Sequence, residues 1–197
     1  TSLADTLDPS SFENEGRVLA EALVGKVPVV YSSTVNLPLA YTWKITLNET
    51  GKVPAFYHVF PELNHNEMTG FDASRSDEEP HSDKPSRGEP HGGLAPSRGE
   101  PLFEDVRDGL NAPFACILLK DILDDPRVAK RMEILEDLYR ARGIPVQTIK
   151  LSGVSVLEKI FSSLLLASWA AFYTAANYGL ESTRVPMVEE FKKRIAG

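Results

Sequence analysis

Short apolar segments alternate with helical segments along this chain, and this alternation constrains the fold more than any other feature. The runs VPVVY (27–31), PFACILLK (113–120) and PVQTIK (145–150) have the length and the β-branched content of buried strands, and residues 54–60 are a fourth candidate. Between these runs, apolar residues recur at helical spacing. Strands that alternate with helices predict an α/β fold with a mainly parallel sheet covered on both faces.

The helices expected between these strands begin and end at recognisable signals. They span about 12–25, 36–49, 126–142 and 154–178, with a short helix after Pro61 and a last helix from Pro186 to about Ile195. Ser11 is expected to cap the first helix, and Gly51 is expected to end the second in a left-handed conformation. The residues predicted to face the core are Val18, Leu19, Ala22 and Leu23, then Leu39, Ala40, Trp43 and Leu47, and finally Val128, Met132, Leu135 and Leu138.

Composition excludes several classes of protein. The net charge is −7 and no basic cluster is present, which argues against nucleic-acid binding. Cys116 is the single cysteine, so a disulfide framework is excluded and a cytoplasmic setting is expected. The uncharged stretch 160–180 is long enough to span a bilayer, but five hydroxyl and amide residues within it favour a core or interface helix. We therefore expect no membrane span.

The chain is expected to form one domain over residues 12–197, preceded by a linker or tail at 1–11. Residues 72–101 differ in character from the rest of that domain. The hexapeptide PSRGEP occurs at 85–90 and again at 96–101, among Asp, Glu, Gly and Pro residues. Such a low-complexity segment lacks the apolar surface needed to order itself. We interpret it as an insertion, with His81 and His91 exposed to solvent.

Candidate functional residues gather between 41 and 71, where Glu49, His58, Glu62, His65 and Glu67 lie among aromatic and apolar residues. Four of them, without Glu49, suggest a metal site, although their spacing matches no standard ligand motif. Asn64 and Glu67 also fit a helix-capping pair around His65.

A second candidate group is Ser32, Ser33 and Thr34, which follow the first strand directly. In α/β folds ligands bind where the carboxyl end of a strand meets the next helix, so these hydroxyl groups suggest phosphate binding. Helix capping is the other interpretation.

Three strings of the chain resemble a known family. They are VPVVYSS (27–33), TLNETGKVPAFYHVFPELNHNEMTGF (46–71) and VPMVEEFKKRI (185–195). They are similar to the C-terminal half of the bifunctional phosphoglucose/phosphomannose isomerases of the SIS-domain superfamily. The resemblance implies a three-layer α/β/α SIS domain with a long C-terminal helix. It also implies isomerisation of glucose 6-phosphate or mannose 6-phosphate to fructose 6-phosphate through an enediol, with no metal or cofactor. The implied assembly is a homodimer whose protomers each contain a further N-terminal SIS domain, which is absent from this chain.

The resemblance also assigns roles to residues. Glu49 matches the base that moves the proton between C1 and C2, and His65 matches a ring-opening histidine donated across the dimer interface. Lys192 or Lys193 matches a lysine that assists ring opening. On a helical wheel Lys192 falls among Val188, Phe191 and Ile195, which favours it for a cleft. The family's phosphate loop and an active-site arginine have no counterpart here, and Ser32 and Ser33 are the candidates for substrate contact.

Without the resemblance, other interpretations of these residues hold. Glu49 is then interpreted as a solvated surface residue, and the two lysines as partners of the helix dipole. A non-catalytic SIS module that binds a sugar phosphate or dimerises is the alternative function. A metal-dependent hydrolase built around His58 and His65 is a third.

Overall fold

Four parallel strands form the sheet predicted from the sequence. The computed structural model describes residues 7–72 and 113–196. The strands are β1 (Val27–Ser33), β2 (Phe56–Phe60), β3 (Phe114–Asp121) and β4 (Val146–Leu151), in the order β2-β1-β3-β4. Each neighbouring pair is parallel, and Val29 of β1 lies between Phe56 of β2 and Cys116 of β3. The carboxyl ends of all four strands therefore share one edge of the sheet, which we call the carboxyl edge.

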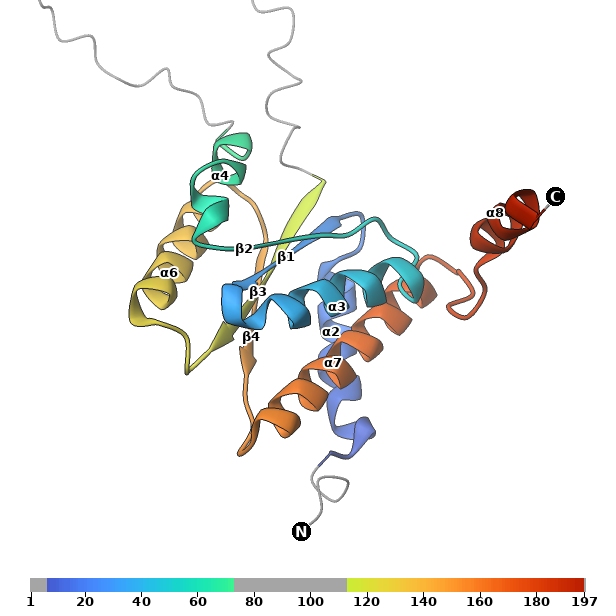
Figure 1. The fold of residues 1–197 in the computed structure, drawn as a ribbon, viewed down its shortest axis with the longest axis horizontal. Coiled ribbons are helices and arrows are strands. Elements are labelled where there is room, and N and C mark those ends of the chain that lie inside the picture. Colours follow the sequence, from blue (N-terminus) through green and yellow to red (C-terminus); the bar gives the residue numbers. More distant parts are fainter. Residues whose placement is uncertain (1–6, 73–112, 197) are drawn as a thin grey trace, which may run out of the picture.

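Helices cover both faces of this sheet, so the predicted three-layer α/β/α architecture is confirmed (Figure 1). One face packs against α2 (Glu13–Ala22), α3 (Leu37–Glu49) and α7 (Val156–Asn177). The other face packs against α6 (Pro126–Ala141) and the segment that contains α4 (Glu67–Gly70). The remaining elements are the 3-10 turns Pro9–Phe12, Thr34–Asn36 and Glu62–Asn64, and the last helix α8 (Pro186–Ala196).

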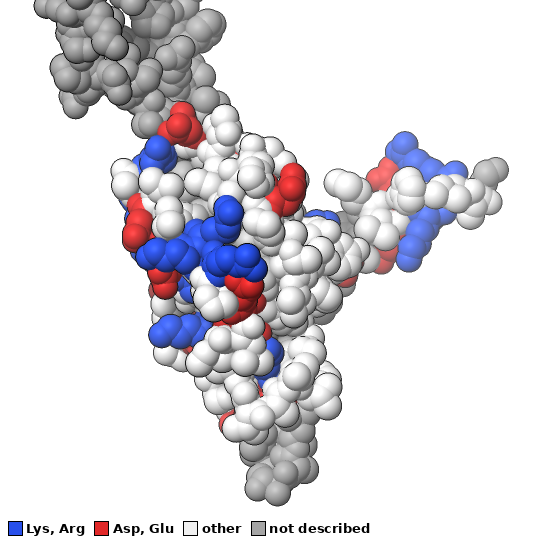
Figure 2. Space-filling view, turned by 60° about the vertical axis from the view of Figure 1, so that its left-hand side comes forward, with Lys and Arg blue, Asp and Glu red and all other residues white. Residues whose placement is uncertain are grey.

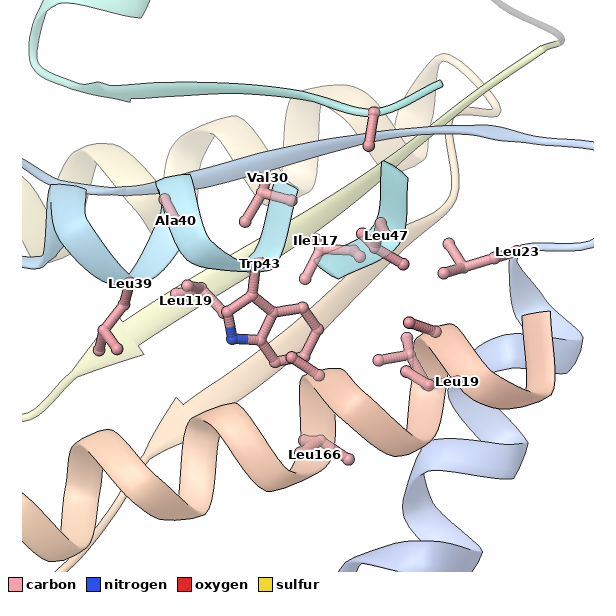
Figure 3. Close-up of a cluster of buried hydrophobic side chains, with 14 of the residues drawn as sticks. Leu19, Leu23, Val30, Leu39, Ala40, Trp43, Leu47, Ile117, Leu119 and Leu166 are labelled. Atoms are coloured by element: carbon pink, nitrogen blue, oxygen red, sulfur yellow. The ribbon is translucent and has the colours of Figure 1, made fainter. Parts of the chain in front are cut away.

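Trp43 is the centre of the larger core (Figure 3). Its ring is fully buried among leucines from α2, α3 and α7, and its Nε1 donates a hydrogen bond of 2.9 Å to Ser163 Oγ. A buried indole N–H needs such a partner. The four predicted inner-face residues of α3 are all buried, as expected.

Close contact between α2 and α7 depends on Gly16. A Cβ atom at Gly16 would lie 2.4 Å from Trp169 Cβ, a distance that no side chain tolerates. The buried stripe of α2 is consequently Gly16, Leu19, Ala20 and Leu23. Val18, predicted to face the core, is 54% exposed instead, because the helix turns its glycine toward α7.

Two helix ends differ from the sequence-based expectation. Asp8, not Ser11, caps the first turn, since its carboxylate accepts from Ser10 N at 3.0 Å. At the end of α3, Lys52 takes the left-handed conformation predicted for Gly51, with φ 59°. Gly51 is required for another reason, because a Cβ there would lie 2.6 Å from the carbonyl oxygen of Leu47. Gly179, just after α7, adopts the left-handed conformation, with φ 65°.

Part of the predicted tail is folded, since Pro9 O accepts a hydrogen bond of 2.7 Å from Trp169 Nε1. The proposed insertion lies outside the described residues except for Asp72, and so do His81 and His91. Within the described ranges, α7 is the helix whose length and apolar composition would allow a membrane span, which is weak evidence for one. In this fold α7 packs against α2 and α3 and contributes seven buried residues.

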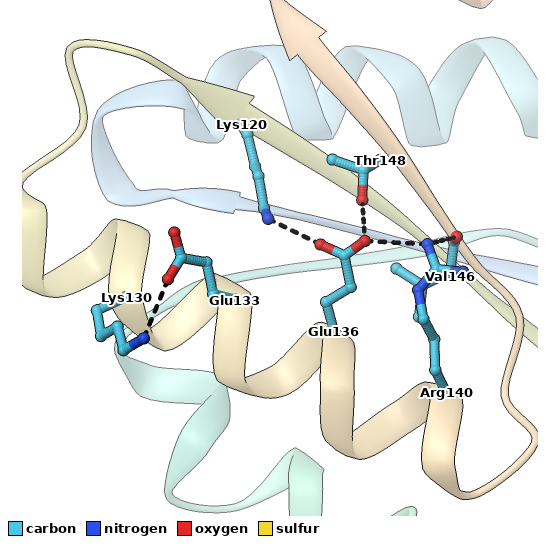
Figure 4. Close-up of polar contacts among 7 residues, drawn as sticks. All are labelled: Lys120, Lys130, Glu133, Glu136, Arg140, Val146 and Thr148. Carbon is cyan, nitrogen blue, oxygen red and sulfur yellow. Dashed lines mark hydrogen bonds and ion pairs between the residues drawn. The ribbon is translucent and has the colours of Figure 1, made fainter.

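Glu136 joins α6 to the sheet (Figure 4). Its carboxylate accepts hydrogen bonds from Lys120 at 2.7 Å, from Arg140 at 2.9 Å and from Thr148 at 2.9 Å. Burial raises the pKa of Glu136, but these hydrogen bonds outweigh burial and lower its pKa to about 2. The ionised carboxylate therefore stabilises the folded state.

We predict that Glu136→Gln lowers the free energy of unfolding by about 1–3 kcal/mol at pH 7. The folded-state pKa lies below the ordinary value of 4.5, so this contribution is complete above about pH 5 and declines as the pH falls toward 2. Urea unfolding at pH 7, 4 and 3 measures the difference from wild type. Glu133→Gln, which removes an exposed ion pair with Lys130, is the control and has a smaller effect. A Glu136→Gln difference that stays constant from pH 7 to pH 3 would contradict this interpretation.

Candidate functional site

The residues predicted to form the site lie at opposite edges of the sheet. Ser32 and Ser33 end β1, and His65 follows β2, so these three lie at the carboxyl edge. Glu49 ends α3 and precedes β2, and it therefore lies at the opposite, amino edge (Figure 1). The five residues of β2 separate the two edges by about 17 Å. Within one chain the structure does not bring Glu49 and His65 together.

Glu49 is exposed at the last position of α3. Among the described residues its carboxylate has no hydrogen-bond or ion-pair partner, so it is available to a ligand or another polypeptide. Hydrogen bonds hold the backbone around it, because Lys52 Nζ donates both to Glu49 O and to Arg184 O, the latter at 2.6 Å. The segment that leads into α8 is thus attached beside Glu49.

Helix α8 projects from the body of the protein at this end (Figures 1 and 2). Lys192 and Lys193 are both exposed. The apolar stripe that should separate them is exposed as well, at 46% for Val188, 62% for Phe191 and 69% for Ile195. The preference for Lys192 as the cleft-facing lysine therefore stays a prediction.

His65 lies on a compact turn that connects Glu62–Asn64 to α4. Leu63 and Phe71 anchor this turn in the second core, while His65 itself is exposed. Asn66, not the predicted Asn64, caps α4, because its side-chain oxygen accepts from Glu67 N. Glu67 in turn accepts a hydrogen bond of 3.0 Å from the buried Tyr31 hydroxyl.

The hydroxyl groups after β1 make internal hydrogen bonds. Ser32 Oγ donates to Ser33 O at 3.0 Å, and Ser33 Oγ accepts from Asn36 Nδ2 at 3.1 Å. Thr34 Oγ1 donates to Phe60 O at 2.8 Å. The prediction that these groups cap the next helix is wrong, because neither the turn at 34–36 nor α3 has a side-chain cap. Their role in substrate contact stays a prediction.

Asn36 links the carboxyl ends of β1 and β3, the two strands between which the strand order reverses and beside which ligands bind in open α/β sheets. Its amide donates to Asp121 and Asp124, each at 3.2 Å, and Lys159 forms an ion pair with Asp121. Burial raises the pKa of Asp121, but hydrogen bonds from Lys159, Leu123 N and Asn36 outweigh it, so its pKa lies below the usual value. Sequence patterns gave no sign of this network, which joins residues 85 positions apart.

A cavity of about 790 Å³ opens beside the network, between the loops at 121–124 and 150–156. Its apolar lining includes Leu123, Met132 and Val154, and its charged lining balances three lysines against three carboxylates: Lys120, Lys150, Lys159, Asp121, Asp124 and Glu133. A volume of this size accommodates a small organic ligand. Neither Glu49 nor His65 lines the cavity.

The predicted metal cluster does not assemble in the part of the chain that the structure describes. No three His, Cys, Asp or Glu side chains converge there in a way that would hold an ion. His58 Nδ1 accepts a hydrogen bond of 2.7 Å from Val59 N. The arrangement therefore gives no support to the hydrolase interpretation.

Comparisons with known proteins agree with the resemblance seen in the sequence. A model of the family described as "Bacterial phospho-glucose isomerase C-terminal SIS domain" matches residues 12–195. The protein named bifunctional phosphoglucose/phosphomannose isomerase from Aquifex aeolicus is 26% identical over 185 residues, which cover 94% of this chain and 47% of the relative. The protein of the same name from Caldicellulosiruptor bescii is 29% identical over 186 residues, covering 93% and 45%. The chain thus spans about half the length of these relatives.

A solved structure agrees with the fold. The glucose-6-phosphate isomerase-like protein from Thermus thermophilus superposes with a TM-score of 0.56 and 16% identity. The match covers 86% of this chain and 45% of the other. At this identity the likeness supports the architecture alone.

We predict that Asp121→Asn lowers the free energy of unfolding by about 2–4 kcal/mol, because the substitution leaves the largely buried Lys159 without a carboxylate. Asp121→Asn combined with Lys159→Met should be more stable than Asp121→Asn alone, because no unpaired buried cation remains. A double-mutant cycle from urea unfolding measures the coupling. Additive effects of the two substitutions would show that the ion pair does not organise this edge.

Proposed function

The chain belongs to the family of bacterial phosphoglucose isomerase C-terminal SIS domains, and from this premise we propose that it is the C-terminal half of a hexose 6-phosphate isomerase. The observation that carries the proposal is the family match over residues 12–195. The proposed reaction converts glucose 6-phosphate, and also mannose 6-phosphate, to fructose 6-phosphate in the cytoplasm. It needs no cofactor, because a carboxylate and an acid/base pair suffice for an aldose–ketose exchange.

Glu49 is the proposed base. Its carboxylate takes the proton from C2 of the open-chain aldose, the electron pair of that C–H bond forms the C1–C2 double bond, and the C1=O π pair moves to O1, which takes up a proton to give the enediol. Return of the C2 proton to C1, with loss of the proton from the C2 hydroxyl as the C2=O bond forms, gives the ketose. Exposure of Glu49 and its lack of a partner among the described residues support this role, since the carboxylate can meet a substrate directly.

His65 and a lysine of α8 are the proposed ring-opening groups. Opening a cyclic hexose requires a proton on the ring oxygen and loss of a proton from the anomeric hydroxyl. An imidazole and an ammonium group suit these steps at neutral pH. Lys192 is proposed for the site, with Lys193 contacting the substrate nearby, and the exposure of both is compatible with that.

A second polypeptide surface completes the proposed site. Glu49 and α8 lie at the amino edge of the sheet, whereas His65 lies at the carboxyl edge. Glu49 and His65 of one chain therefore cannot contact the same hexose. In a homodimer, His65 of one protomer would join Glu49 of its partner, and an N-terminal SIS domain would supply the phosphate contacts. Ser32 and Ser33 are proposed to line the substrate region from the carboxyl edge, although both side chains are buried in the isolated fold.

A non-catalytic SIS module remains the second candidate. The internal hydrogen bonds of Ser32, Ser33 and Asn36 favour the form of this module that dimerises, because these groups lie where ligands bind in open α/β sheets and they already bond one another. Titration calorimetry of the chain with fructose 6-phosphate and with inorganic phosphate, combined with the assay below, separates binding from catalysis.

We predict that Glu49→Gln in the complete protein lowers kcat for fructose 6-phosphate formation by about 10²–10⁴-fold with little change in KM. Exchange of the C2 hydrogen with solvent, followed by NMR in deuterium oxide, should fall in parallel. Glu15→Gln, at an exposed position of α2, is the matched control and should retain wild-type activity. Activity of Glu49→Gln within a few-fold of wild type would reject Glu49 as the base.

A further inference from the structure

Among the described residues, the turn that contains His65 is hydrogen-bonded to the sheet through Glu67, and Arg131 of α6 makes a longer, exposed contact of 3.4 Å with Asn64. Residues 61–71 pass from β2 through the turn Glu62–Asn64 to α4. Leu63 and Phe71 bury apolar surface, which holds the turn in place but does not determine its orientation. Glu67, two residues beyond His65, points toward the sheet and accepts a hydrogen bond of 3.0 Å from Tyr31 Oη.

Tyr31 is suited to act as a fixed donor. It lies near the end of β1, is fully buried, and packs edge-on against Phe60 at 6.4 Å and Tyr139 at 6.3 Å between ring centroids. Burial, followed by the proximity of Tyr139, Cys116 and Glu67, raises its pKa far above the usual value, so the hydroxyl keeps its proton. A buried phenol needs an acceptor, and a carboxylate makes the stronger hydrogen bond.

Tyr139 is the only other hydroxyl that the described structure places near Tyr31, and it is a poorer partner. The two oxygens lie 3.4 Å apart, against 3.0 Å for the contact with Glu67. The Tyr31–Glu67 bond is therefore the shorter and the charge-assisted one. It connects residues 36 positions apart and passes from the interior to the turn that presents His65.

Hydrogen bonds of Asn66 stabilise the turn locally. Asn66 lies between His65 and Glu67, caps α4 through its side-chain oxygen, and donates from Nδ2 to Glu62 at 3.1 Å. With Glu67 fixed, the backbone from 62 to 67 has little freedom to rotate. His65 itself is exposed, so the backbone of the turn fixes the position from which its side chain extends.

We propose that Tyr31 and Glu67 form a latch that orients His65, and that both are positioning residues for the step in which His65 takes part. This inference rests on the proposed function and deepens it. Neither residue touches the substrate. The latch attaches the turn that bears His65 to the sheet. His65 is therefore held in place for an active site that a second polypeptide completes.

The first test is structural and uses this chain alone. Tyr31→Phe removes the hydroxyl and keeps the ring packing, whereas Tyr139→Phe removes the neighbouring hydroxyl and keeps the latch. We expect faster hydrogen–deuterium exchange over residues 62–70 in Tyr31→Phe by about tenfold, and unchanged exchange there in Tyr139→Phe. If Tyr31→Phe does not fold, Glu67→Ala removes the same bond from the partly exposed side. Unchanged exchange in the folded latch variant would overturn the proposal.

The second test uses the complete protein and two kinds of substrate. With glucose 6-phosphate, Tyr31→Phe should lower kcat by about 10–100-fold, whereas Glu67→Gln, whose amide oxygen still accepts from Tyr31, should retain most activity. A four-carbon aldose phosphate that cannot close a ring needs no ring opening. Solvent exchange of its C2 hydrogen should be unchanged in Tyr31→Phe and lost in Glu49→Gln.

The outcomes separate the latch from the function on which it rests. Wild-type activity of His65→Ala on glucose 6-phosphate would reject the role of His65 and the latch with it. Loss of activity in His65→Ala with wild-type activity in Tyr31→Phe would reject the latch alone. If Tyr31→Phe lost activity equally on both substrates, the substitution would have caused a general structural defect. That result would also overturn the proposal.

Discussion

Parallel pairing of β1 and β2 is the constraint on which the rest of this structure depends. A parallel pair needs a crossover, so α3 must run back along the sheet before β2 begins. The last residue of α3 and the first residues after β2 therefore lie at opposite edges, however close they are in sequence. Glu49 and His65 are 16 positions apart in the chain (65 − 49) and are separated by the length of a strand.

Two buried polar groups make this arrangement rigid. On one face the Trp43 indole donates a hydrogen bond to Ser163, so the helix that ends in Glu49 is fixed to α7. On the other face Tyr31 bonds Glu67, and the turn of His65 is attached to the same β1 strand. Both edges are thus held by hydrogen bonds whose donors lie in the core. By contrast, the segment before α8 is held by the hydrogen bond from Lys52 Nζ to Arg184 O, and Lys192 and Lys193 on α8 are exposed.

The positions of all four strands and of the main helices followed from hydrophobic periodicity, because burial on both faces of a parallel sheet leaves a clear apolar pattern. Helix ends were less predictable. Lys52 takes the left-handed position because Gly51 is needed for space against Leu47, a contact that no local pattern reveals. Long-range pairs such as Asn36 with Asp121, or Tyr31 with Glu67, depend on strand order and could not be inferred from spacing. The roles proposed for Glu49, His65 and Lys192 came from the resemblance. Patterns alone class Glu49 as a surface residue, place His65 in a capping pair or a metal cluster, and say of Lys192 only that it suits a cleft better than Lys193.

The central claim is that Glu49 and His65 of one chain serve different active sites. Complementation tests it most directly: the complete protein is made as Glu49→Gln and as His65→Ala, and the two inactive variants are unfolded and refolded together. A mixed dimer holds one site with both wild-type groups and one with neither, so random pairing should restore about one quarter of wild-type activity. Activity no greater than that of the two variants refolded separately would contradict the account.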